Sequence, residues 1–60
     1  GVIIKKGAVV ENSVILPGVT IGEDMVVKYA VVDKKVKATR KKELIGEPDR
    51  PIYIKRGDRI

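Results

Sequence analysis

The chain has no cysteine, no histidine, no tryptophan and no phenylalanine, and only two tyrosines among its 60 residues. Without Cys it can form neither a disulfide framework nor a thiolate metal site. Without His a hydroxyl nucleophile has no imidazole base in this chain, and metal ligation would depend on scattered carboxylates. We therefore predict that these residues are not catalytic and hold no cofactor and no metal.

Long apolar runs are missing as well. The longest stretch without a charge, residues 12–22, contains Pro and Gly and is far shorter than the roughly 20 apolar residues of a membrane span. We therefore predict no membrane partner, and the lack of Cys fits a cytoplasmic location. The sequence starts at Gly1 rather than Met and shows no signal-like order, so we expect it to be a piece of a longer chain.

What remains for a core is aliphatic, and it recurs at one constant offset along the chain, which we call the repeat period. The repeating pairs are Ile4 and Ile21, Val9 and Val26, Val10 and Val27, Val14 and Val31, Ile15 and Val32, and Val19 and Val36. An antiparallel meander would give a similar alternation of apolar residues and turns, but it does not explain a fixed offset. Three short strands per turn do explain it, because residues one period apart then stack on each other. We predict an all-β fold, a parallel β-helix of about three coils.

Two units of the repeat, ILPGVT at residues 15–20 and IGEDMV at residues 21–26, resemble the hexapeptide repeats of left-handed parallel β-helices. The resemblance implies left-handed coils. We predict a single domain with regular coils over residues 4–37. A degenerate coil with a Pro-containing loop is expected over residues 38–53, followed by a partial last coil or cap over residues 54–60.

The last segment has the same form as an earlier one. Ile54-Lys55-Arg56-Gly57 repeats the order of Ile4-Lys5-Lys6-Gly7, and the separation of 33 residues between Ile21 and Ile54 is one short of two repeat periods. Two good coils and a partial one bury little apolar surface. We therefore expect further upstream coils, or other copies of the chain, to cover the open end before Ile4.

Thirteen Lys and Arg against eight Asp and Glu give a net charge of +5, which favours anionic partners. The densest cluster comprises Lys34, Lys35, Lys37, Arg40, Lys41 and Lys42. It is either a solvated face or a site for phosphate esters. Nucleic-acid binding usually adds stacking aromatics, and neither tyrosine lies in the cluster, so we predict no nucleic-acid partner.

The order of segments, from AVVDKKV through LIG and a Pro-containing loop to PIYIKRG, resembles the C-terminal β-helix domain of bacterial glucose-1-phosphate adenylyltransferases, also called ADP-glucose pyrophosphorylases. The regulatory-type subunit is the most similar. The resemblance implies a longer parent, with an N-terminal catalytic domain not included here, that makes ADP-glucose from ATP and glucose 1-phosphate with magnesium for glycogen biosynthesis. It implies that this domain mediates homo- or hetero-oligomers, commonly tetramers, and helps to bind phosphorylated effectors.

Charge alone suggests which residues would contact an effector phosphate. The candidates are Arg40, Lys41 and Lys42, or Lys55 and Arg56. Alternative parents are another sugar nucleotidyltransferase or a hexapeptide-repeat acyltransferase, which would need an upstream His. A free-standing anion-binding or nucleic-acid-binding module is a third alternative. The sequence does not decide whether the parent subunit is itself active.

Overall fold

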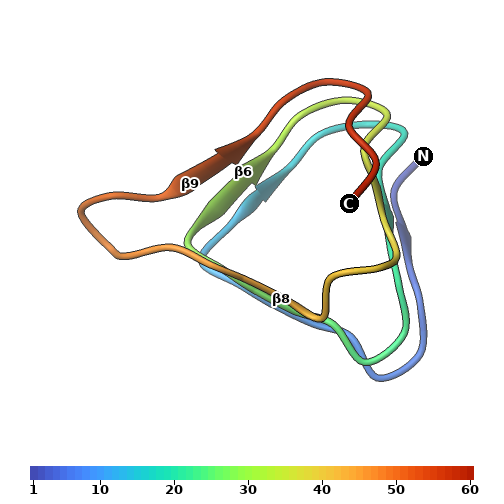
Figure 1. Cartoon of the computed structure of the whole chain (residues 1–60), viewed down its shortest axis with the longest axis horizontal. Coiled ribbons are helices and arrows are strands. Elements are labelled where there is room, and N and C mark those ends of the chain that lie inside the picture. Colours follow the sequence, from blue (N-terminus) through green and yellow to red (C-terminus); the bar gives the residue numbers. More distant parts are fainter.

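The computed structural model describes residues 1–60 and contains nine short strands and no helix. The strands are β1 (Ile3–Ile4), β2 (Val9–Glu11), β3 (Val14–Ile15), β4 (Thr20–Ile21), β5 (Val26–Lys28), β6 (Ala30–Val32), β7 (Lys37–Ala38), β8 (Glu43–Ile45) and β9 (Ile52–Ile54). Every third strand pairs in parallel, which gives sheet A (β1-β4-β7), sheet B (β2-β5-β8) and sheet C (β3-β6-β9). The three sheets form the sides of a triangle (Figure 1). The predicted all-β parallel architecture is confirmed.

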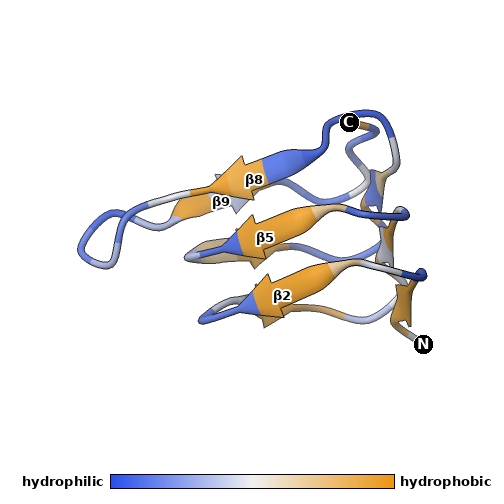
Figure 2. Cartoon of the chain, turned by 90° about the horizontal axis from the view of Figure 1, so that it is seen from below, coloured by the Kyte–Doolittle hydropathy of each residue, from blue (hydrophilic) through white to orange (hydrophobic).

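The coils are left-handed, as the hexapeptide resemblance implied. In Figure 1 the chain runs clockwise from β1 around the triangle. Figure 2, turned to view the stack from the side, shows β2, β5 and β8 as successive layers from the N-terminal to the C-terminal end. The C-terminal layer lies nearest the viewer of Figure 1, so the chain turns clockwise as it approaches, which is a left-handed path.

The register confirms the repeat period found in the sequence. Val10 lies beside Val27, and Ile15 lies beside Val32. The same step continues into the third coil, where Leu44 lies beside Val27. Parallel strands about 4.8 Å apart therefore stack like side chains in vertical columns.

A side-chain hydrogen bond also spans one period of the helix. The Ala30 N–H donates to the Ser13 hydroxyl, 17 residues away in sequence, at 3.2 Å. The same hydroxyl donates to the Glu11 carbonyl at 2.8 Å. Ser13 therefore ties the first coil to the second at the corner between sheets B and C.

These columns form the core. Nine buried apolar residues make one cluster, and none of them is aromatic. They are Val19, Ile21, Met25, Val27, Ala30, Val32, Val36, Ala38 and Leu44. Most belong to the middle coil, because only that coil has a neighbour on both sides.

The corners between sheets require left-handed backbone, and the residues that adopt it also stack. Asn12 and Tyr29 have φ of 49° each at one corner. At another corner Gly18, Lys35 and Gly57 have φ of 81°, 62° and 77°. Residues other than Gly, Asn and Asp rarely adopt a positive φ. The neighbouring coils therefore hold Tyr29 and Lys35 in this conformation.

The third coil contains an insertion that changes the register of β9. Ala30 pairs with Ile52, whereas an unbroken period would pair it with residue 47. The extra residues, 47–51, form a loop that projects from the corner between β8 and β9 (orange in Figure 1). The loop is closed by two backbone hydrogen bonds between Glu47 and Arg50, of 3.1 and 3.0 Å.

The two similar segments at Ile4 and Ile54 therefore lie at different corners of the triangle. Ile54 pairs with Val32 on sheet C, so it does not share a column with Ile4 and Ile21 on sheet A. The reason is that an aliphatic residue, two cations and a left-handed Gly produce the same corner wherever they occur. Such a segment identifies a corner, but it does not identify which of the three corners.

The N-terminal end of the solenoid is open. Val2, Ile3 and Ile4 are exposed there, together with Val9 and Val14 on the outer faces of the first coil. No coil lies beneath β1, β2 and β3, so each has one unpaired edge. No helix in the structure could span a membrane.

Candidate functional site

Stacking of the second and third coils gathers cations at the corner between sheets C and A. Lys37 is bridged to Arg59 in parallel register, and the Gly57 N–H donates to the Lys34 carbonyl at 3.0 Å. This register brings residues 34–37 beside residues 56–59. We call the resulting surface the basic corner; it comprises Lys34, Lys35, Lys37, Lys55, Arg56 and Arg59.

All six cations of the basic corner are exposed. The one ion pair in the chain lies elsewhere, between Lys28 Nζ and Glu11 Oε1 at 3.4 Å on sheet B. Like charges directly opposite on paired strands are destabilising. Lys37 and Arg59 are such a pair, and a bound anion would relieve their repulsion.

Asp33 borders the basic corner, and its carboxylate is already engaged. It accepts hydrogen bonds from the Tyr53 hydroxyl, one coil further on, and from the Lys34 N–H. The bond from Tyr53 and then the one from Lys34 hold the pKa of Asp33 below its ordinary value. The same bond raises the pKa of Tyr53, because a hydroxyl that donates to a carboxylate gives up its proton less readily.

These two shifts define a pH window for the Asp33–Tyr53 link. A lowered carboxyl pKa stabilises the fold above the unfolded-state pKa, and this contribution is lost as the pH falls through the folded-state pKa. A raised Tyr pKa stabilises the fold below the unfolded-state pKa, and this contribution is lost as the pH rises through the folded-state pKa. The link is therefore intact across the neutral range.

The structure separates the two groups of predicted effector contacts. Lys55 and Arg56 belong to the basic corner. Arg40, Lys41 and Lys42 lie beyond the other end of β7, where the chain turns toward β8. In that second group the Arg40 and Lys41 N–H groups donate to the Ile60 carbonyl, and Lys42 Nζ donates to the Glu23 carbonyl at 3.2 Å.

Arg59 was not among the candidate contacts, and Lys34, Lys35 and Lys37 were noted only as part of a charged run. No signal in the sequence joins them to Lys55 and Arg56, because the loop of residues 47–51 lengthens the step between the second and third coils. With a strict period, Lys37 would face residue 54, which is Ile54. The basic corner becomes visible only once the register of β9 is known.

The basic corner is an open surface of exposed cations. The structure has no pocket, and nowhere do three or more Asp or Glu side chains gather as a ligand set. Lys and Arg can donate several charge-assisted hydrogen bonds to phosphate oxygens.

Comparison with known proteins gives the family. The family described as GlmU-like, C-terminal hexapeptide, matches residues 1–51. The chain belongs to this family. Its match covers the first two coils and the third as far as the loop, which agrees with the observed solenoid.

Two curated relatives are both glucose-1-phosphate adenylyltransferases. The protein from Corynebacterium jeikeium (strain K411) is 47% identical over 45 residues, which cover 75% of this chain and 11% of that protein. The protein from Corynebacterium diphtheriae is 49% identical over 35 residues, which cover 58% of this chain and 8% of that protein. The chain thus spans about a tenth of the length of these relatives. No solved structure matches it significantly.

Proposed function

We propose that this chain is the β-helix region of a glucose-1-phosphate adenylyltransferase of the regulatory type, where it serves in subunit assembly and effector binding. Its similarity to the two corynebacterial proteins carries the proposal. The parent would make ADP-glucose from ATP and glucose 1-phosphate for glycogen biosynthesis. Its catalytic residues and its magnesium site would lie in a part of the protein outside these 60 residues.

The open N-terminal end supports a role in assembly. Exposed Ile3 and Ile4 and the unpaired edges of β1, β2 and β3 require a cover. Further coils of the parent chain would provide the same register beneath this end. Contacts along the outer faces of the sheets would then hold the subunits of a homo- or hetero-oligomer such as a tetramer.

The basic corner supports a role in effector binding. Lys55 and Arg56 stand there beside four other exposed cations and without an ion pair. In contrast, Arg40, Lys41 and Lys42 form a smaller group at the C-terminal end of the solenoid, and the Lys42 ammonium is engaged by the Glu23 carbonyl. Of the two candidate groups, Lys55 and Arg56 are therefore the better contacts for the phosphate of a metabolite.

Charge reversal at each group in the full-length protein tests this proposal. Lys55→Glu with Arg56→Glu removes two cations of the basic corner, and Arg40→Glu with Lys41→Glu is a control with the same change in charge. The assay is ADP-glucose formation as a function of sugar-phosphate concentration, with any partner subunit present. We expect the first variant to need at least about a hundredfold more activator, because two lost charge-assisted hydrogen bonds are together worth roughly 3–6 kcal/mol.

The outcomes separate the parts of the proposal. An unchanged response in both variants would refute effector binding at these cations but would leave the parent assignment intact. Failure of the full-length protein to support ADP-glucose formation, alone or with any partner subunit, would refute the assignment itself. A monomeric full-length protein in sedimentation would refute the assembly role.

A further inference from the structure

The columns of the core end on charged residues at the C-terminal end. Met25 and Val36 of the middle coil are fully buried. One coil further on, Lys42 stands at the register position of Met25, and Asp58 at that of Val36. The Lys42 ammonium reaches back and donates to the Glu23 carbonyl at 3.2 Å, so its charge leaves the end of the core.

The backbone also closes over this end. Between β7 and β8 the chain passes inside the corner between sheets A and B (yellow in Figure 1). The first two coils pass around the outside of this corner. In the lower coils the Gly22 N–H donates to the Ala38 carbonyl, whereas in the third coil the Arg40 and Lys41 N–H groups both donate to the Ile60 carbonyl. Ile60 packs against the core, and the C-terminus lies within the triangular outline.

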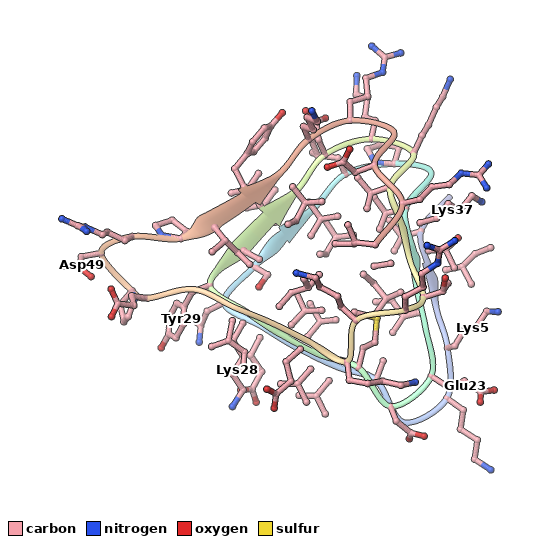
Figure 3. All side chains as sticks on the ribbon, viewed as in Figure 1. Lys5, Glu23, Lys28, Tyr29, Lys37 and Asp49 are labelled. Carbon is pink, nitrogen blue, oxygen red and sulfur yellow. The ribbon has the colours of Figure 1, made fainter.

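The two ends are therefore different surfaces. The N-terminal end presents the apolar starts of the columns, including exposed Ile4 and half-buried Ala8 and Val10. Figure 3 shows mostly aliphatic side chains inside the triangle, while the labelled Lys5, Glu23 and Lys28 point outward from it. If a second copy stacked its N-terminal end on this C-terminal end in continuous register, Lys42 would lie under Ala8, and Asp58 under Val2, of that copy.

We infer that the C-terminal end is a built-in cap that blocks the addition of another coil from a second copy of this chain. Stacking would bury the Lys42 and Asp58 charges without partners, which is costly. Head-to-tail contacts of this kind do not close on themselves and produce fibres. The cap leaves the outer faces of the sheets for association, and it does so whether or not the basic corner binds an effector.

The test replaces the two charges by the residues found one coil below. The variant carries Lys42→Met and Asp58→Val, which continue the apolar columns to the end. A control with the same change in charge and composition carries Lys34→Met and Asp49→Val, at exposed positions on the corner between sheets C and A and at the loop tip, away from the cap segment of residues 40–42. Sedimentation velocity and far-UV circular dichroism on residues 1–60 over a range of concentrations report association and β content.

We expect the Lys42 and Asp58 variant to form large assemblies at concentrations about a hundredfold lower than wild type, because two apolar side chains per contact become buried. The control should behave as wild type. Equal association of the variant and wild type, with β content retained, would overturn the inference, and so would equal association of the control.

Hydrogen exchange on the wild type keeps the inference testable if the variant does not fold. The amides of Arg40, Lys41 and Ile60 each donate a hydrogen bond at the cap and should exchange slowly. If these three amides exchange as fast as those of an unstructured peptide, while the middle-coil amides are protected, the cap does not exist.

Discussion

Ile21 offers the sharpest test of the core, because it is fully buried in the sheet A column between Ile4 and Ala38. Replacement by Ala leaves a cavity that Ile4 and Ala38 cannot fill, because both are fixed in strands and the Ala38 side chain is too short to reach into it. Truncation of a buried Ile to Ala lowers the unfolding free energy by roughly 2–5 kcal/mol. We expect about 3–4 kcal/mol for Ile21→Ala from that range.

This loss is large for so small a domain. A chain of this length has a total unfolding free energy of about 3–9 kcal/mol. Ile21→Ala therefore removes at least a third of the stability and brings a marginal chain close to unfolding. With a urea dependence of about 1 kcal/mol per molar, the midpoint should fall by about 3 M.

Two further Ile-to-Ala changes serve as controls in the same urea titration, followed by far-UV circular dichroism. Ile4 stands in the same column at the open end and is 49% exposed, so Ile4→Ala should cost about half as much as Ile21→Ala. Ile45 is 49% exposed on sheet B outside the core, and Ile45→Ala should cost less than about 1 kcal/mol. If Ile21→Ala were no more harmful than Ile45→Ala, the inner columns would not be the core.

The remaining predictions concern the third coil. Tyr53→Phe should raise the pKa of Asp33 toward its ordinary value, only in part because the Lys34 N–H still donates, and a carboxyl NMR titration measures it. Wild type should lose thermal stability as the pH falls below the ordinary pKa of Asp and as it rises above the ordinary pKa of Tyr. Tyr53→Phe should make both losses smaller. Deletion of residues 47–51 restores the regular period and should leave the thermal midpoint unchanged or higher. Deletion of 46–51 removes one residue more than the insertion, so that β9 must shift by a single position, which turns its inner side chains outward and should unfold the third coil.

The loop and Asp33 predictions have distinct contradicting results. A Tyr53→Phe variant with an unchanged Asp33 titration would show that the hydroxyl does not reach the carboxylate in solution. Equal thermal midpoints for the two deletions would show that β9 is not held in register on β6.

The fold could be predicted from the sequence because its physical cause repeats in the sequence. Val10 and Val27, or Ile15 and Val32, stand one period apart, and stacking in parallel register is what such an offset means. Composition had already excluded large aromatic anchors, so the core had to consist of these columns. Handedness came from the resemblance of the hexapeptide units, since a repeat alone does not define it.

The basic corner could be predicted only in part. Lys55 and Arg56 were candidates from charge, but their neighbours Lys34 and Lys37 come from the preceding coil. Two prolines marked the loop as irregular, yet its length in the third coil follows only from the pairing of Ala30 with Ile52. Such an insertion leaves local turn chemistry intact while it moves every later residue to another column. Site residues contributed by two coils therefore require the structure.

The central claim is that the side chains form vertical columns in parallel register, and Val27 tests it most directly. It pairs with Val10 below and Leu44 above, one period away on each side. Nuclear Overhauser effects from the Val27 methyl groups should reach both residues. Val27 methyl groups that show contacts to neither Val10 nor Leu44 would contradict the account.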